Sequence, residues 1–165
     1  MNGAKTEFLS TNSFSKVEVE ECEFEALDYF KHLGLIIQAN GSLDRETDKR
    51  IVEGIKVISK MNSVLQNINI IVSIKWKIYN IIFQSIILYG SKTWILKKRQ
   101  KERLMATQMD FCRRSTGKSR LEKICNETIR ETMNVKKNII QMIEEKQLGL
   151  FGHVMHIGHE RLPNH

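Results

Sequence analysis

Short stretches of alternating apolar and polar residues mark the first forty positions of the chain. Residues 6–10 and 16–20 alternate with a period of two, and residues 30–37 form a third apolar run with Gly34 inside it. A period of two places apolar side chains on one face of a β-strand. The pattern therefore predicts three or four short antiparallel strands in this part of the chain.

The apolar pattern changes to a helical period after a break at residues 40–42. Ser42 is a candidate N-cap, and Asp44 and Glu46 would complement the positive end of the following helix dipole. The apolar positions of one predicted stripe are Ile51, Ile55, Ile58 and Leu65. Gly54 lies inside this segment and weakens the helix by about 1 kcal/mol relative to alanine.

Further helices are predicted in the rest of the chain. Their patterns cover residues 70–89, 98–114, 121–133 and 137–150. The first carries a wide isoleucine face made of Ile71, Ile74, Ile78, Ile81, Ile82 and Ile86. Gly90 and Gly117 are placed to end two of these helices. The predicted fold class is α+β and mostly α, with short antiparallel strands followed by helices, and the composition shift near residue 41 marks the boundary.

Charge is distributed unevenly along the chain, whose formal net charge is +7. Residues 1–50 hold six Lys and Arg against ten Asp and Glu, a net of −4, and residues 51–165 hold twenty against nine, a net of +11. Residues 97–123 are the densest basic stretch, with ten basic and three acidic residues. The positive charge of residues 51–165 favours a polyanion such as nucleic acid as a partner, although an ordinary solvated surface gives weaker versions of the same pattern.

Composition narrows the class of protein further. Hydrophobic residues make up 41% of the 165 residues, charged residues 27%, and there is one proline, which is typical of a helix-rich globular domain. Three cysteines give no disulfide framework and fit a reducing, intracellular compartment. Residues 78–91 are free of charge for only 14 positions, shorter than the roughly 17–25 residues of a membrane helix. No membrane association is expected.

Residues 115–119, with Gly117 and Lys118, offer the ending of a phosphate-binding loop. That motif requires a glycine at position 112, where this chain has Cys112, and a buried strand before the loop, where the sequence is basic and helical. A glycine that stops a helix, followed by basic residues, is the preferred interpretation.

Histidines and cysteines raise the question of a zinc site. His153 and His156 are three residues apart and His159 follows, while Cys112 and Cys125 could complete a ligand set. The cysteines have twelve residues between them, where a zinc knuckle has about two to four. We expect no metal site, with Cys112 packed in the core and the histidines at the surface.

Tryptophans are the remaining candidates for a binding role. Trp76 lies between Lys75 and Lys77, and both base stacking and core packing stay open for its side chain. Trp94 is expected in the core.

Several blocks of the sequence occur in an order that resembles one known family. They are N-G-A-K-T at 2–6, F-K-H-L-G at 30–34, G-S-L-D-R-E at 41–46, L-Y-G-S-K-T-W at 88–94, C-R-R at 112–114, N-E-T-I-R at 126–130 and F-G-H-V at 151–154. Together they resemble the C-terminal part of the reverse transcriptase of non-LTR (LINE-type) retrotransposons, a class of transposable element. His32 stands where the family usually has tyrosine, and Lys92 replaces the usual acid.

The resemblance implies a palm remnant with a primer-grip hairpin at 1–40, a helical thumb at 41–96 and a basic helical region at 97–165. It implies that Lys5 is the palm lysine that protonates the departing pyrophosphate in the full-length RNA-directed DNA polymerase. Such polymerases hold Mg²⁺ on palm aspartates, and this chain, with no F-A-D-D or Y-A-D-D sequence, would begin just after them. We therefore expect no cofactor in this chain, no polymerisation by it alone, and the upstream palm as a partner.

The resemblance also implies contacts with an RNA–DNA hybrid or DNA through phosphates, without sequence specificity. The residues expected at this interface are Phe30, Lys31, Leu33, Gly34, Lys49, Arg50, Lys56, Lys60, Lys75, Trp76, Lys77, Lys97, Lys98, Arg99, Lys101, Arg113, Arg114, Lys118 and Arg120. The alternatives are a helical protein–protein interaction module and a non-functional transposon relic. The basic residues 97–101 could serve as a nuclear signal or face phosphate, which leaves nuclear and cytoplasmic localisation both open.

Overall fold

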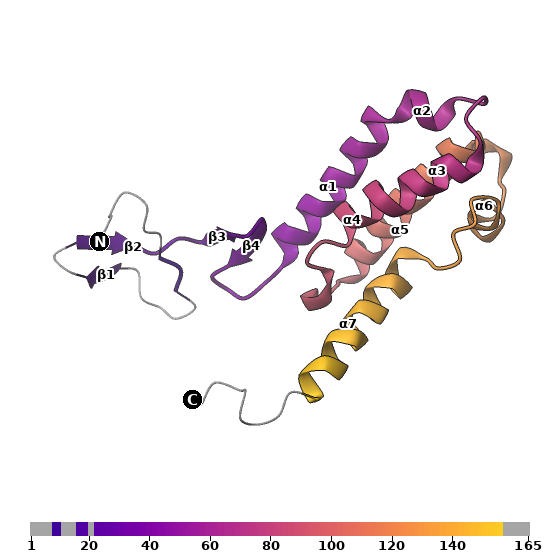
Figure 1. The fold of residues 1–165 in the computed structure, drawn as a ribbon. Coiled ribbons are helices and arrows are strands. Elements are labelled where there is room, and N and C mark those ends of the chain that lie inside the picture. Colours follow the sequence, from indigo (N-terminus) through magenta and orange to yellow (C-terminus); the bar gives the residue numbers. More distant parts are fainter. Residues whose placement is uncertain (1–7, 11–15, 20–21, 157–165) are drawn as a thin grey trace. The chain divides into compact units, whose positions relative to one another are not determined.

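The computed structural model describes residues 8–10, 16–19 and 22–156, and these residues form short antiparallel strands followed by helices (Figure 1). The predicted fold class, α+β and mostly α, is confirmed. The chain divides into two compact units, Met1–Lys49 and Arg50–His165. The division into segments 1–40, 41–96 and 97–165 stays a prediction.

The strands of the first unit form two separate hairpins in the described residues. Strand β1 (Lys16–Val19) pairs with β2 (Cys22–Glu25), and β3 (Tyr29–His32) pairs with β4 (Leu35–Gln38), both antiparallel. Of the strand predicted at 6–10, residues 6 and 7 lie outside the described part, and Phe8 forms a single bridge with Ala26. The period-two pattern at 16–20 thus placed β1, β2 was not singled out by it, and the apolar run around Gly34 forms the β3–β4 hairpin.

The turn between β3 and β4 has an unusual backbone. Leu33 has a φ of 47° and Gly34 a φ of 84°, so both turn residues adopt positive φ, as a two-residue type I′ turn requires. Glycine adopts this conformation without strain, whereas a leucine pays about 1–2 kcal/mol for it. The Leu33 side chain is 78% exposed, so burial does not offset that strain.

Polar contacts fix the β3–β4 hairpin to the first turns of helix α1 (Asp44–Lys60). The buried carboxylate of Glu46 accepts a hydrogen bond from the Ile36 backbone N–H at 2.8 Å, and Lys49 Nζ donates to the Gly34 carbonyl at 2.8 Å. Ser42 Oγ accepts from the Asp44 N–H at 3.2 Å, which agrees with its expected capping role. Glu46 therefore does more than complement the helix dipole, because it joins the helix to the hairpin.

Helices make up the second unit, which begins inside α1. The elements that follow are α2 (Asn62–Gln66), α3 (Val72–Ile78), the π-helical turn η2 (Tyr79–Phe83), α4 (Gln84–Ile87), the 3₁₀ turn η3 (Ser91–Thr93), α5 (Lys98–Thr116), the 3₁₀ turn η4 (Arg120–Glu122), α6 (Asn126–Thr132) and α7 (Ile139–Met155). Gly117, with a φ of 67°, ends α5, so this predicted helix end is confirmed. Gly90 has a φ of 74°, but α4 already ends at Ile87 and Gly90 begins the turn η3, so the predicted end at residue 89 is two residues too late. In the described residues, no helix is long and apolar enough to cross a membrane.

Three aromatic rings in mutual contact form the centre of the helical core. Phe83 lies 5.4 Å from Tyr79 and 5.0 Å from Phe111 between ring centroids, and all three side chains are fully buried. Aromatic pairs at these separations add about 0.5–1.5 kcal/mol to the free energy of area burial. Cys112, the residue after Phe111, is also buried, as predicted.

The prediction that the isoleucines of residues 70–89 form the buried face is wrong, because a different side of this segment is buried. Lys75, Tyr79, Phe83 and Ile87, spaced four residues apart, point into the core, whereas Ile81 is 70% exposed and Ile71 63% exposed. The π-helical turn explains the difference, because its extra residue per turn keeps positions four apart on one side of the helix.

The stripe predicted for α1 is also partly wrong. Ile51 and Ile58 are buried, but Ile55 is exposed and Gly54 takes its place on the buried side. A Cβ atom at Gly54 would lie 2.4 Å from Ile87 Cδ1. The glycine therefore allows α1 to approach α4 closely, and this contact accounts for a residue that propensity alone disfavours.

Candidate nucleic-acid interface

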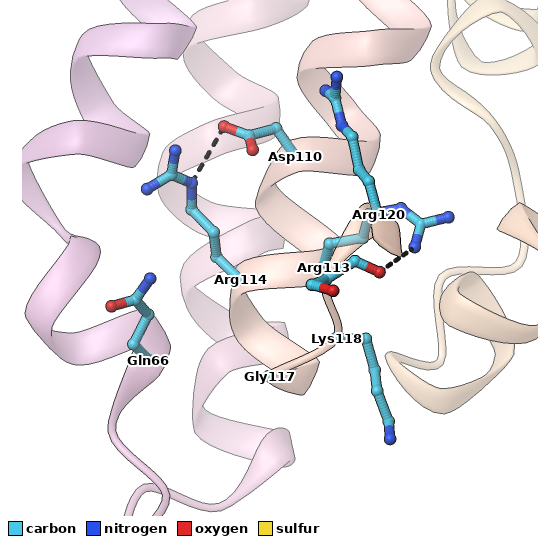
Figure 2. Close-up of a pocket in the computed structure, with 8 residues that line it drawn as sticks. Gln66, Asp110, Arg113, Arg114, Gly117, Lys118 and Arg120 are labelled. Carbon is cyan, nitrogen blue, oxygen red and sulfur yellow. Dashed lines mark hydrogen bonds and ion pairs between the residues drawn. The ribbon is translucent and has the colours of Figure 1, made fainter. Parts of the chain in front are cut away.

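A cavity of about 530 Å³ lies at the C-terminal end of α5 (Figure 2). We call it the basic pocket, and its lining residues are Gln66, Asp110, Arg113, Arg114, Gly117, Lys118, Ser119 and Arg120. Four cationic side chains and one carboxylate line it, a formal sum of 4 − 1 = +3. An excess of positive charge in a concave surface is the arrangement that attracts phosphate groups.

Local backbone geometry brings these cations together. Gly117 ends α5 in a left-handed conformation, with its N–H donating to the Arg114 carbonyl at 3.3 Å and the Lys118 N–H donating to the Arg113 carbonyl at 3.0 Å. This reversal returns Lys118 and Arg120 beside the last turn of the helix. The predicted glycine stop is confirmed, and a helix stands where a phosphate-binding loop would need a strand.

Neighbouring side chains hold Arg114 in place. Its Nε donates to Asp110 Oδ2 at 3.1 Å, and its Nη1 donates to Asn62 Oδ1 of α2 at 2.6 Å. Neither partner was predicted from the sequence, although Asp110 lies four residues before Arg114, which is a recognised helical ion-pair spacing. A guanidinium fixed in this way loses less conformational freedom when it binds an anion.

The other cations of the basic pocket differ in how far they are engaged. Arg113 is committed to the fold, because it donates to the Ile124 carbonyl at 2.7 Å and to Asn126 Oδ1 at 3.0 Å. Lys118 pairs with Glu122 at 3.2 Å, and Arg120 is exposed. A hydrogen bond from the Ser119 backbone and the contact with Lys118 lower the pKa of Glu122. Lys118 and Arg120 are therefore the exposed cations that a phosphate could reach, and Arg114, whose Nε and Nη1 are engaged, has its remaining N–H groups to offer.

The basic stretch 97–123 forms two clusters instead of one surface. Lys97, Lys98, Arg99 and Lys101 lie at the N-terminal end of the 19-residue helix α5, whereas the basic pocket lies at its other end. At 1.5 Å per residue, the two ends are roughly 27 Å apart. The first three of these side chains are exposed, and Lys101 is partly buried.

Lys75 does not lie where the sequence analysis expected it. It is only 4% exposed, and its Nζ donates to the Ser115 carbonyl in the last turn of α5 at 3.0 Å. Burial lowers the pKa of this amine. Lys75 satisfies a carbonyl that has no partner within its own helix, so it is not a nucleic-acid contact.

The remaining expected residues are distributed over both units. Lys56, Lys60 and Lys77 are exposed, and so is Lys31. Arg50 is buried, pairs with Glu53 at 3.0 Å and lies 4.4 Å from the Tyr89 ring centroid. Phe30 is partly buried and stacks on His32. Lys5 and the block at 2–6 lie outside the described residues.

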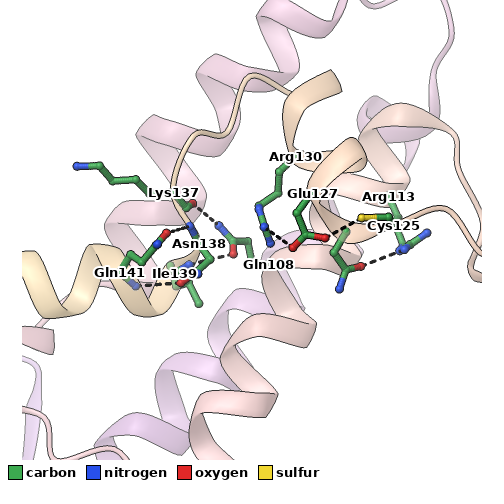
Figure 3. Close-up of polar contacts among 10 residues, drawn as sticks. Gln108, Arg113, Cys125, Glu127, Arg130, Lys137, Asn138, Ile139 and Gln141 are labelled. Carbon is green, nitrogen blue, oxygen red and sulfur yellow. Dashed lines mark hydrogen bonds and ion pairs between the residues drawn. The ribbon is translucent and has the colours of Figure 1, made fainter.

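Tryptophans and thiols have distinct environments. Trp94 is buried, as expected, whereas Trp76 is partly exposed and its Nε1 donates to the Asn134 carbonyl at 3.1 Å. Burial raises the pKa of the Cys112 thiol to about 12. Cys125 is exposed and donates to Glu127 Oε2 at 2.7 Å (Figure 3).

His153 and His156 are exposed, and His159 lies outside the described residues. Among the described residues there is no group of three His, Cys, Asp or Glu side chains that could hold a metal ion. Comparisons with protein-family models, with curated proteins and with solved structures find no match to the chain. The function therefore has to be argued from the site itself.

Proposed function

We propose that this chain is the C-terminal part of a LINE-type reverse transcriptase and that its own activity is sequence-nonspecific binding of an RNA–DNA hybrid or DNA. The observation that carries the binding proposal is the basic pocket, in which Arg114 is held by Asp110 and Asn62 beside Lys118 and Arg120. The sequence blocks described above carry the family proposal.

Phosphate contacts explain both the affinity and the lack of specificity that we propose. Arginine presents a planar fork of N–H groups that matches phosphate oxygens, and lysine adds a point charge. Such contacts position the nucleic acid backbone and do not distinguish bases. Each neutralised phosphate releases counterions, so the affinity falls steeply as salt is added.

Catalysis by this chain alone is not part of the proposal. The sequence contains no F-A-D-D or Y-A-D-D, so the carboxylates that would hold Mg²⁺ have to come from the upstream palm. Lys5 would act only in that context. Purified chain should give no metal-dependent primer extension, and detectable extension would contradict this assignment.

The test is fluorescence anisotropy with a labelled RNA–DNA hybrid across a series of NaCl concentrations. We expect the double substitution Lys118→Gln with Arg120→Gln to weaken binding about tenfold or more and to reduce the slope of log Kd against log salt by about 2. The matched control, Lys92→Gln with Lys146→Gln, removes the same charge from exposed positions outside the basic pocket. Equal losses in both variants would show that only net charge matters.

Exposed isoleucines support a second candidate function, a helical protein–protein interaction module. Ile68, Ile71, Ile74 and Ile81 are exposed on and before α3 and η2. Soluble monomers rarely expose contiguous apolar patches larger than a few hundred Å². Sedimentation separates the two candidates, because an oligomer that is insensitive to salt and lacks nucleic-acid affinity favours the interaction module.

A further inference from the structure

A second cavity, of about 340 Å³, lies between the α3–η2–α4 segment and the connection from α6 to α7. We call it the aromatic pocket. The lining residues that matter here are Trp76, Asn80, Gln84, Asn134 and Lys136. Its volume is at the lower end of the roughly 300–1,000 Å³ typical of small-ligand sites. Its wall combines two aromatic residues, side-chain amides and two lysines, none of which lines the basic pocket.

Trp76 forms a fixed aromatic wall of this pocket. Its Nε1 donates to the Asn134 carbonyl at 3.1 Å, and the indole is only partly buried. Asn134 has a φ of 55°, a left-handed conformation that is uncommon for a residue other than glycine. This conformation ends α6, with the Asn134 N–H donating to the Glu131 carbonyl at 2.9 Å and the Val135 N–H donating to the Arg130 carbonyl at 2.8 Å, and it fixes the carbonyl that Trp76 contacts.

The π-helical turn supplies the amide groups. Asn80 lies in the first part of η2, and its Oδ1 accepts from Gln84 Nε2 at 2.6 Å. Both amides line the pocket, and an amide group has the donors and acceptors to contact the edge of a base. Single π-helical turns occur frequently at functional sites.

Gln108 makes the rear of the aromatic pocket rigid. Its Nε2 donates to the Tyr79 hydroxyl at 2.6 Å. Nε2 also donates to the Lys137 carbonyl at 3.2 Å, and Oε1 accepts from the Ile139 N–H at 2.9 Å (Figure 3). This buried amide therefore joins α5 to η2 and to the start of α7. A pocket whose walls are already hydrogen-bonded loses little entropy when it binds a flat ligand.

We infer that the aromatic pocket takes an unpaired nucleobase of a bound strand, stacked on Trp76 and contacted by the amide of Asn80. This inference rests on the proposed nucleic-acid binding and adds a preference for single strands to it. A flat aromatic ring needs a stacking surface and in-plane polar partners, and Trp76 and Asn80 offer both. The exposed Lys136 on the same wall would meet the phosphate of that nucleotide.

The test uses the unmodified chain with a labelled oligothymidylate, following anisotropy and tryptophan fluorescence in one titration. The chain has two tryptophans, and Trp94 is buried, so a quench that tracks binding reports on Trp76. We expect Trp76→Leu to weaken oligothymidylate binding about 5- to 100-fold and to change binding of the RNA–DNA hybrid less than twofold. Trp76→Phe should retain most of the affinity, because it keeps a stacking ring.

The outcomes separate this inference from the proposed function. Anisotropy that rises without a quench, or equal losses for single strand and hybrid in Trp76→Leu, overturns the stacking inference and leaves phosphate binding intact. No anisotropy change with either nucleic acid overturns the proposed function, and the inference with it. The quench in the unmodified chain does not depend on any variant folding.

Discussion

In the Met1–Lys49 unit, the β3–β4 hairpin is fixed to the first turns of α1 by hydrogen bonds to Glu46 and Lys49, whereas in the Arg50–His165 unit the helices pack around a cluster of aromatic rings. Hydrogen bonds contribute about 0.5–3 kcal/mol each, depending on charge, whereas removing a buried phenylalanine side chain costs about 3–5 kcal/mol. We therefore expect single substitutions to cause local opening in the Met1–Lys49 unit and to lower the stability of the whole Arg50–His165 unit.

The aromatic cluster should give the largest effect. Phe111→Ala removes a fully buried ring that contacts Tyr79 and Phe83, and we expect it to lower the free energy of unfolding by about 3–5 kcal/mol. Denaturant unfolding followed by far-UV circular dichroism measures the loss. Phe151→Ala is the matched control, because that ring is 63% exposed and should change stability by about 0.5 kcal/mol or less. Similar losses in both variants would contradict the role of the buried aromatic cluster in stabilising the Arg50–His165 unit.

Alkaline pH should weaken the same core through Cys112. The thiol ionises near 9.0 when exposed but has a pKa of about 12 in the folded chain, because burial disfavours the thiolate. Above pH 9.0 the unfolded chain releases this proton and the folded chain keeps it, so stability falls as pH rises through about 12. One such group accounts for about 2–3 kcal/mol by pH 11.

Urea unfolding between pH 8 and 11 checks this linkage. Burial also raises the pKa of Tyr79, which adds to the loss of stability above pH 10. Burial lowers the pKa of Lys75, which opposes that loss. We therefore compare Cys112→Ala with Cys125→Ala, whose thiol is exposed. Cys112→Ala should reduce the fall in the free energy of unfolding with rising pH, and Cys125→Ala should leave that fall unchanged. An unchanged slope in Cys112→Ala would exclude the buried thiol as the cause.

Glu46 tests the polar junction of the first unit. Glu46→Ala removes the acceptor of the Ile36 N–H and leaves that donor without a charged partner. A loss of about 1.5–3 kcal/mol corresponds to amide exchange at Ile36 that is roughly 10- to 150-fold faster. Hydrogen exchange followed by NMR measures it, together with the amides of α5. Glu53→Ala, which removes a carboxylate from the same helix, is the control and should leave Ile36 within twofold.

The hairpin turn should give the smallest effect and one of opposite sign. Leu33→Asn places Asn-Gly in the type I′ turn, which favours positive φ at both positions, and should stabilise the hairpin by about 1 kcal/mol. Slower exchange of the β3 and β4 amides would report it. Leu121→Asn is the control, since Leu121 is also exposed but does not have a positive φ. A gain at both positions would indicate a solubility effect instead of turn geometry.

Local signals predicted much of the fold. Alternation found strand β1, Gly34 marked the hairpin, and Gly117 marked a helix end, because these features depend on neighbours in the sequence. The buried side of α3 and α4 was not predictable from a period of 3.6, since the π-helical turn changes the phase.

The candidate site was less predictable from sequence. Lys75 looked like part of a basic surface, but its partner is a carbonyl 40 residues away in the chain. The basic stretch 97–123 looked continuous, but α5 separates its two ends. Charge composition located the cations and not their partners, because Asn62 reaches Arg114 only through the packing of α2 against α5.

The buried amine of Lys75 can report how often the helical unit opens. Acetic anhydride or another acylating reagent needs direct access to an amine, and Lys75 is shielded between α3 and α5, whereas Lys77, two residues later, is exposed. The modification rates of these two lysines, read from one peptide by mass spectrometry, would compare the opened population with the folded one. Acylation of Lys75 would thus measure local unfolding of the helices that bury it.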